Sequence, residues 1–182
     1  MTIPDNAILI GPWCAGKTTL GRKAAQGSST SFVDLDDLAE RYWDEIGYGL
    51  DRLLERNQVV DMLDSEMEWE PARAHAVLRS LEDHPTGILA LGAAYTNYLD
   101  FELFEKVKVA LECTPRPIVL VTPSLDEQTC REITEQRAWN TRGPDWVTQR
   151  QDIDSWSATE LDNIVAEEVI ITRERIHRSP SR

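Results

Sequence analysis

The stretch GPWCAGKTTLG, which begins at Gly11, constrains this chain of 182 residues more than any other feature. A short aliphatic run, AILI, precedes it, and a helical pattern follows it. The stretch fits the pattern GxxxxGK(S/T) in full, with Gly11, Gly16, Lys17 and Thr18 at the fixed positions. Glycine permits the dihedral angles that turn backbone N–H groups inward around a phosphate. The sequence therefore predicts a phosphate-binding loop (residues 11–18), and the alternative is a glycine-rich turn without a ligand.

The side chains of this loop suit a nucleotide and a divalent cation. The Lys17 ammonium can reach the β- and γ-phosphates, and the Thr18 hydroxyl can ligate Mg²⁺. The following helix adds the positive end of its dipole. We therefore expect ATP and Mg²⁺ as cofactors, Lys17 as a catalytic residue and Thr18 as a metal ligand. The nucleotide-binding residues expected in the loop and just after it are Gly11, Pro12, Trp13, Cys14, Ala15, Gly16, Lys17, Thr18 and Thr19.

Apolar runs and helical patterns alternate along the rest of the chain. The strands are expected at Ala7–Ile10, Ser31–Leu35, Gly87–Leu91, Pro117–Val121 and Glu168–Thr172. The runs AILI, IVLV and VIIT are almost entirely aliphatic, which is typical of strands covered on both faces. The helices are expected at Lys17–Gln26, Asp37–Asn57, Glu66–Glu82, Phe101–Glu112 and Leu125–Trp139, with the helical insertion broken near Gly47–Gly49. This alternation indicates βαβ units, so the expected fold class is α/β, with three layers and a parallel sheet.

The second predicted strand ends in the carboxylates of SFVDLDDL. Asp34 and Asp36 lie two residues apart, so in a strand both side chains would point to one side. In an open parallel sheet, ligands collect beyond the carboxyl ends of the strands. One carboxylate can bind Mg²⁺ through water, and the other can orient and deprotonate an attacking hydroxyl. The alternative is that Asp36, or more readily Asp37, caps the helix that follows.

The combination of GPWCAGKTT, FVDLD and GILALGAA resembles the shikimate kinase family and its gluconate-kinase-like relatives. The resemblance runs in order from Ile8 to about Thr172 and is most specific at the phosphate-binding loop. It implies a P-loop NTPase fold with a five-stranded parallel sheet, a helical substrate-binding insertion and a lid. The regions implied are a single kinase domain over residues 1–182, an insertion at about 37–84 and a lid at about 131–156.

The resemblance also implies roles for individual side chains. Asp34 helps to hold Mg²⁺, and Asp36 contacts the acceptor hydroxyl as a catalytic and substrate-binding residue. Arg131 falls near the arginine that packs on adenine, and Arg137 falls near the lid arginine that closes over the phosphates. A guanidinium there stabilises the charge of the transferred phosphoryl group. Arg142 and Arg150 are further lid candidates, and Arg142 is also counted as a substrate-binding residue; for each arginine the alternative is a solvated helix face.

Glycine and tryptophan mark the predicted lid. Gly143-Pro144 indicates a loop and a candidate hinge. Trp139, Trp146 and Trp156 are candidates for closing the lid against water or substrate. Trp13, in the phosphate-binding loop, is expected to be either a lid contact or an exposed ring.

Two departures from the family change the expected acceptor. In EWEPAR, Glu70 stands where shikimate kinases carry the arginine that grips the substrate carboxylate, and Arg73 is the remaining candidate cation. The family's triple glycine reads Gly92-Ala93-Ala94, which leaves Gly92 as the expected substrate-binding residue. We therefore expect a small polar metabolite or natural product other than shikimate. The acidic residues at 61, 64, 66, 68 and 70 favour a hydroxyl- and amine-bearing acceptor only if they line the pocket.

Composition limits the partners. The formal net charge is −13, and such an acidic surface repels a phosphate backbone, so no nucleic-acid partner is expected. No segment approaches the roughly 20 apolar residues of a membrane span, so no membrane association is expected. Three cysteines without metal-ligand spacing fit reduced thiols and a cytoplasmic location. The expected partners are ATP and a small-molecule acceptor, and the oligomeric state stays open.

These residues favour an ATP-dependent small-molecule kinase, and two alternatives stay open. One is a nucleotide-binding regulatory protein without transferase activity, which the missing arginine and glycines allow. The other is a nucleotide kinase. That activity needs arginines in the insertion for a second set of phosphates, and the acidic insertion speaks against it.

Overall fold

The computed structural model describes residues 2–49, 51, 67–150 and 156–172. Within these ranges, five strands form one sheet in the order β2-β3-β1-β4-β5, and all four pairings are parallel. The strands are β1 (Ala7–Ile10), β2 (Phe32–Asp34), β3 (Ile88–Ala90), β4 (Ile118–Thr122) and β5 (Glu168–Ile171). Leu9 pairs with Ala90 on one side and with Val119 on the other, so β1 lies at the centre. The predicted α/β fold with a five-stranded parallel sheet is confirmed.

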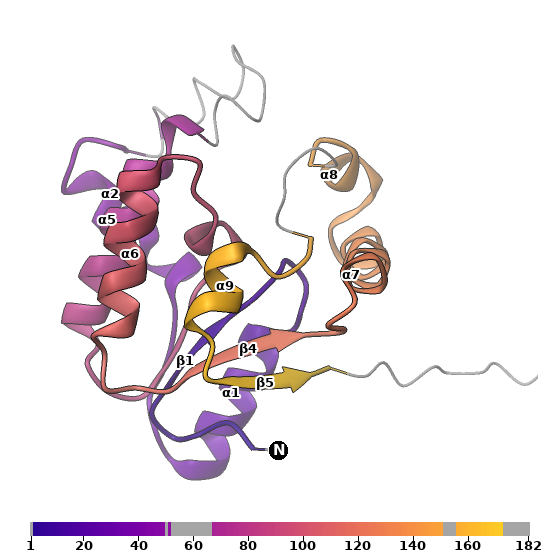
Figure 1. Ribbon diagram of the computed structural model, residues 1–182, viewed down its shortest axis with the longest axis horizontal. Helices are drawn as coiled ribbons and strands as arrows, with labels where there is room; N and C mark the ends of the chain where they lie inside the picture. The colour runs from indigo at the N-terminus through magenta and orange to yellow at the C-terminus, as the bar shows by residue number, and fades with distance from the viewer. Residues whose placement is uncertain (1, 50, 52–66, 151–155, 173–182) are drawn as a thin grey trace, which may run out of the picture.

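Helices cover both faces of this sheet (Figure 1). The helices are α1 (Lys17–Ser28), α2 (Ala39–Asp44), α5 (Glu70–Asp83), α6 (Phe101–Glu112), α7 (Glu127–Arg142), α8 (Pro144–Thr148) and α9 (Glu160–Val165), with 3-10 turns η1 (Leu35–Asp37) and η2 (Ala93–Thr96). Ile8 and Ile10 face a core that α2, α5, α6 and α9 complete, while Ala7 and Leu9 face α1. Both sets are buried, which explains why the strand sequences are aliphatic throughout.

The helix predicted from Asp37 begins at Ala39 and ends before the break that was predicted near Gly47–Gly49. Residues 35–37 form η1, and α2 ends at Asp44, before Gly47 adopts a positive φ of 77°. Residues 52–57 lie outside the described part of the chain. The helix predicted over Glu66–Glu82 is present as α5, and α6 has the predicted bounds. In the described ranges, no helix combines the length and apolar character needed to cross a lipid bilayer.

Arg116 fixes the starts of the central strands, at the edge of the sheet opposite their carboxyl ends. Its buried guanidinium donates to the carbonyl oxygens of Ala7 (3.1 Å) and Gly87 (2.7 Å). A third hydrogen bond, of 2.7 Å, goes to His84. Strands held at one end in this way present the loops at their other end in a fixed relation to each other.

Candidate active site

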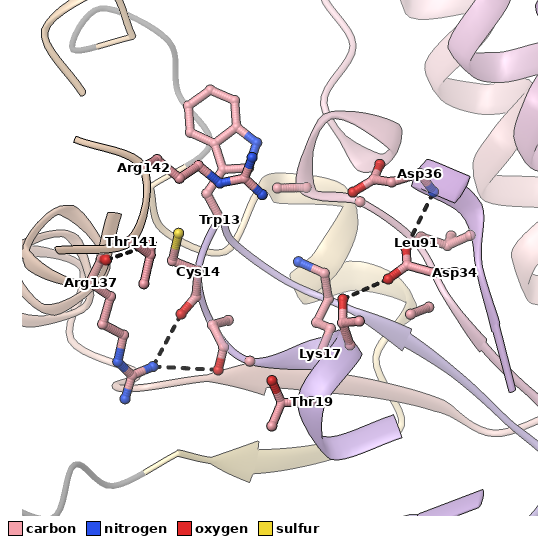
Figure 2. Close-up of a pocket in the computed structure, with 16 residues that line it drawn as sticks. Trp13, Cys14, Lys17, Thr19, Asp34, Asp36, Leu91, Arg137, Thr141 and Arg142 are labelled. Atoms are coloured by element: carbon pink, nitrogen blue, oxygen red, sulfur yellow. Dashed lines mark hydrogen bonds between the residues drawn. The ribbon is translucent and has the colours of Figure 1, made fainter. Parts of the chain in front are cut away.

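A pocket of about 520 Å³ lies beyond the carboxyl ends of β1, β2 and β3 (Figure 2). It is lined by residues 13–19, by Asp34 and Asp36, by residues 90–93, and by Arg137, Thr141 and Arg142 from α7. Segments far apart in sequence therefore meet at the sheet edge where open α/β folds bind ligands. Most of the sequence-predicted site residues lie in this lining; the exceptions are Gly11, Pro12, Arg73 and Arg131.

The glycines of the phosphate-binding loop are required by its backbone. Gly11 and Gly16 have φ values of 126° and 102°, which favour glycine. A Cβ added to Gly11 would also overlap the carbonyl oxygen of Val121 on β4. Gly16 caps α1 without a side-chain hydrogen bond. The first-turn N–H groups of α1 lack intrahelical partners, so they and the helix dipole form a seat for an anion.

Lys17 is nearly buried within the loop, with 8% of its surface exposed. Its Nζ donates to the carbonyl oxygens of Gly11 (2.6 Å) and Pro12 (2.8 Å). Burial lowers the pKa of Lys17, and the carboxylates of Asp162, Asp36 and Asp34 oppose that shift. These hydrogen bonds hold the ammonium group within the loop, beside the anion-binding N–H groups of the first turn of α1.

Thr18 and Asp34 form a pair of oxygen donors next to Lys17. The Thr18 hydroxyl donates to Asp34 Oδ2 at 2.6 Å, and Asp34 is buried. Carboxylate and hydroxyl oxygens suit Mg²⁺, which usually keeps several water or phosphate ligands. No group of three or more His, Cys, Asp or Glu side chains that could hold a metal ion is found among the described residues. The oxygen donors of Thr18 and Asp34 would fit Mg²⁺ whose remaining ligands come from water and phosphate.

Asp36 reaches the pocket by a route that differs from the prediction. The strand ends at Asp34, and η1 rather than strand alternation directs Asp36 into the pocket. Asp34 caps η1 by accepting a hydrogen bond from the Asp36 N–H at 3.3 Å, and α2 has no side-chain cap. The alternative that Asp36 or Asp37 caps the following helix is therefore wrong, and the Asp36 carboxylate is available to a ligand.

The surroundings of Asp36 raise the pKa of its carboxyl. Loss of hydration raises the pKa of Asp36, and the nearby Asp34 carboxylate raises it further. Lys17 and Arg142 act in the opposite direction. Asp36 also lies directly against Gly92, where an added Cβ would overlap Oδ1. A carboxyl with a raised pKa, held beside two cations, suits a general base.

The two candidate lid arginines lie differently relative to the loop. Arg137 donates to the carbonyl oxygens of Cys14 (3.3 Å) and Ala15 (3.4 Å) and also binds Thr172. Figure 2 shows this guanidinium on the far side of the loop backbone from Lys17. Arg142 extends alongside the Trp13 indole towards the middle of the pocket in the same view. Arg137 therefore stabilises the loop backbone, whereas the Arg142 side chain extends into the pocket.

Arg131, expected on adenine, lies on α7 outside the pocket lining. Its Nε donates to Glu135 at 2.7 Å, one turn along the helix. Of these two arginines on α7, Arg137 lines the pocket and Arg131 does not.

Three tryptophans join the phosphate-binding loop to the segment after α7. The ring centroid of Trp13 lies 5.4 Å from that of Trp146 and 5.2 Å from that of Trp156. Trp146 and Trp156 are 5.9 Å apart, and all three contacts are edge-to-face. Trp13 is therefore a contact of the predicted lid region, one of its two expected alternatives. Trp139, by contrast, is 54% exposed and outside this tryptophan cluster (Trp13, Trp146 and Trp156).

The insertion residues that depart from the family are structural in the described region. Glu70 is buried and accepts hydrogen bonds from the N–H groups of Leu99 (2.8 Å) and Asp100 (2.9 Å). Arg73 is also buried, lies 3.9 Å from Glu70 and donates to the carbonyl oxygen of Asn97. Glu70 therefore holds a loop and does not face the pocket. The acidic residues at 61, 64 and 66 lie outside the described residues.

Asp162 is a site-related residue that the sequence predictions missed. It is fully buried on α9, where it forms a capping box with Thr159. Among the carboxylates that raise the pKa of Lys17, Asp162 has the largest effect. The T-x-x-D spacing predicts the start of a helix. It does not predict that Asp162 lies near Lys17.

Solved kinases share this fold. The chain matches a shikimate kinase from Acinetobacter baumannii, solved with shikimate, at 19% identity and a TM-score of 0.57, over 93% of this chain and 84% of that one. A gluconokinase from Sinorhizobium meliloti matches at 12% identity and a TM-score of 0.52, over 96% and 86%. A shikimate kinase from Aquifex aeolicus matches at 15% identity and a TM-score of 0.50, over 91% and 84%.

These likenesses establish the fold of a shikimate- and gluconate-kinase-like P-loop protein, as the sequence motifs predicted. No protein-family model matches the chain, and no curated protein matches it in sequence.

Proposed function

We propose that this protein is an ATP- and Mg²⁺-dependent kinase that transfers the γ-phosphate to a hydroxyl group of a small polar molecule. The observation that carries the proposal is the placement of Asp36 in one pocket with Lys17 and the Thr18–Asp34 pair. A phosphate seat, a metal-binding pair and a candidate base are the parts that phosphoryl transfer needs. The related fold of solved shikimate kinases and a gluconokinase supports this assignment.

Each residue has a separate task in the proposed reaction. The amides of the phosphate-binding loop and Lys17 bind the phosphates, and Thr18 with Asp34 would hold Mg²⁺. The metal ion, when bound, neutralises charge on the phosphate oxygens. The acceptor oxygen bonds to the γ-phosphorus while the bond to the β–γ bridging oxygen breaks, and Asp36 takes the hydroxyl proton.

We assign the arginine that faces the γ-phosphate to Arg142 in place of Arg137. Arg137 also lines the pocket, but its guanidinium is held by the loop carbonyls and Thr172, on the far side of the loop backbone from Lys17. Arg142 lines the pocket and lies close enough to Asp36 to lower the pKa of that carboxyl. A cation facing the pocket stabilises charge where it develops during transfer.

The acceptor proposed here is not shikimate. Glu70, in the place of the family's carboxylate-binding arginine, is occupied by two backbone N–H groups, and Arg73 is paired with it. We propose a hydroxylated metabolite or natural product, phosphorylated in the cytoplasm. The three cysteines form no disulfide, as a reducing compartment requires.

The test is a coupled assay for ADP with Mg²⁺-ATP and fractionated pools of hydroxylated metabolites. A pool that raises ADP release above the acceptor-free rate supports the kinase, and mass spectrometry identifies the phosphorylated product. Asp36→Ala is expected to keep nucleotide binding and lose transfer. If every pool fails while ATP still binds, the regulatory alternative is favoured. If ATP does not bind, the phosphate-binding assignment is wrong as well.

A further inference from the structure

Trp146 contacts Arg142, the cation that faces the proposed phosphate site. It lies on α8, directly after the Gly143 turn, while Arg142 is the last residue of α7. The guanidinium carbon of Arg142 lies 5.1 Å from the Trp146 ring centroid. Tryptophan is the best aromatic partner for a cation, and the contact holds a guanidinium plane in a defined orientation.

The ring of Trp146 is itself held from two sides. Trp13 contacts it edge-to-face at 5.4 Å, and Trp156 does so at 5.9 Å. Trp156 is fixed in turn, because it is buried and its Nε1 donates to the carbonyl oxygen of Arg150 at 2.8 Å. Since Trp13 belongs to the phosphate-binding loop, the loop and the ring beneath Arg142 are parts of one packed cluster.

We propose that Trp146 is a positioning residue that presents Arg142 to the γ-phosphate, and that the tryptophan cluster sets this arginine relative to the phosphate-binding loop. The inference rests on the proposed function, because it assigns Arg142 to the third phosphate of the nucleotide. It adds a source of selectivity: the protein distinguishes ATP from ADP through a ring that need not touch either nucleotide. A long, flexible arginine side chain is thereby given one orientation before the nucleotide arrives.

The consequence is a specific pattern of binding. Without the ring, Arg142 has no defined orientation and loses contact with the γ-phosphate, whereas the loop amides and Lys17 still bind the β-phosphate. Trp146→Leu should therefore weaken binding of a triphosphate by roughly three- to thirty-fold, the range of a cation–π contact. Binding of ADP should change less than twofold.

The experiment is isothermal titration with the non-hydrolysable triphosphate AMP-PNP and with ADP, both with Mg²⁺. The variants are Trp146→Leu, Arg142→Ala and the double variant. Arg142→Ala should show the same selective loss, and the double variant should lose no more than Arg142→Ala alone, because the ring acts through the arginine. Additive losses in the double variant, or an equal weakening of ADP and AMP-PNP by Trp146→Leu, would overturn the proposal.

Two variants serve as matched controls. Trp139→Leu removes an exposed tryptophan of α7 that lies outside the cluster, and it should leave both affinities unchanged. Arg150→Ala removes the other guanidinium near the Trp146 ring, 4.4 Å from its centroid and outside the pocket lining. It should leave the ratio of AMP-PNP to ADP affinity unchanged. A change in that ratio as large as that of Arg142→Ala would assign the role to Arg150 and overturn the proposal.

A conservative variant covers the case in which Trp146→Leu fails to fold. Trp146→Phe keeps an aromatic face of weaker cation–π strength, so its selective loss should be smaller than that of Arg142→Ala but measurable. A Phe variant with wild-type affinity for AMP-PNP and weaker ADP binding contradicts the inference. If the wild-type protein binds neither nucleotide, the proposed function fails first, and the inference fails with it.

Discussion

Asp36 depends on its neighbours for both its position and its charge. The η1 turn directs it into the pocket, and Gly92 leaves room for its Oδ1 atom. Reduced hydration and Asp34 raise its pKa, and Lys17 and Arg142 partly oppose that shift. In the proposed reaction this placement suits Asp36 to proton transfer at some cost to stability, which is a common feature of functional sites.

Replacing Asp36 by Asn should remove both the proposed proton transfer and the cost of the Asp36 carboxylate to stability. The native state holds the Asp36 proton more tightly than the unfolded chain, so this carboxyl stabilises the protein fully below the ordinary pKa of 3.8. That contribution is lost as pH rises through the raised pKa. Between pH 3.8 and the raised pKa, the melting temperature of the wild-type protein should therefore fall as the pH rises. In Asp36→Asn this fall should be smaller, and the proposed phosphoryl transfer should be abolished. Thermal melts from pH 4 to 8 measure this, and an unchanged pH profile would contradict the assignment.

Gly92→Ala should disable Asp36 without touching the nucleotide. The new Cβ would overlap Asp36 Oδ1, so the carboxylate must move away from the acceptor. Displacement of a catalytic group by about 1 Å costs on the order of 100-fold in rate. Nucleotide affinity should stay within twofold. Gly27→Ala is the matched control, because nothing lies within 4 Å of a Cβ there; an equal loss of kcat in both variants would refute the steric explanation.

At the level of the elements, the sequence was most informative where structure is local. The four residues of β1 and the twelve of α6 have the predicted bounds, because continuous burial and helical spacing are both visible in the sequence. The end of β2 was misplaced by one residue, which changed the explanation for Asp36. Short α8 and α9 were missed, since each depends on packing against distant parts of the chain more than on its own pattern.

The turn between α7 and α8 supports a prediction at this scale. Gly143 has φ 93° and ψ 165°, a region essentially restricted to glycine, and nothing lies within 4 Å of a Cβ there. Gly143→Ala should therefore cost roughly 1–3 kcal/mol of backbone strain alone. The melting temperature should fall by about 2–12 °C, and because α8 carries Trp146, selectivity for a triphosphate should fall too.

Gly47→Ala provides the comparison for that experiment. Gly47 also has a positive φ, of 77°, with no atom within 4 Å of a Cβ, but it lies after α2 and away from the tryptophan cluster. It should lower the melting temperature and leave the ratio of ATP to ADP affinity unchanged. Loss of selectivity in both variants would indicate a general effect of destabilisation.

For the molecule as a whole, nucleotide binding should be visible as stabilisation. A ligand at 100 times its Kd adds about 2.7 kcal/mol to the free energy of unfolding. For a chain of this size that corresponds to a rise of roughly 5–10 °C in melting temperature. Mg²⁺ with ATP should produce this shift, and Lys17→Met should abolish it. A wild-type shift caused by Mg²⁺ alone would be inconsistent with a site that needs phosphate oxygens.

The sequence predicted which segments meet in the pocket but not how each side chain is used there. The phosphate-binding loop, Asp34 and Asp36 were found because their spacing follows from local backbone geometry. The different positions of Arg137 and Arg142 relative to the loop could not be found, since they depend on how α7 crosses the loop. The burial of Glu70 by Leu99 and Asp100 likewise rests on a contact between residues about 30 positions apart.

The tryptophan cluster also gives the protein an intrinsic optical probe. Three indoles whose ring centroids lie 5.2–5.9 Å apart have coupled electronic transitions, and the coupling depends on the angle between the rings. Trp13 moves with the loop and Trp146 with α8, so any shift between the two alters the near-ultraviolet circular dichroism of the unlabelled protein. Trp13→Phe gives the baseline against which that signal is read. The position of the loop relative to α8 can thus be followed optically before any acceptor is identified.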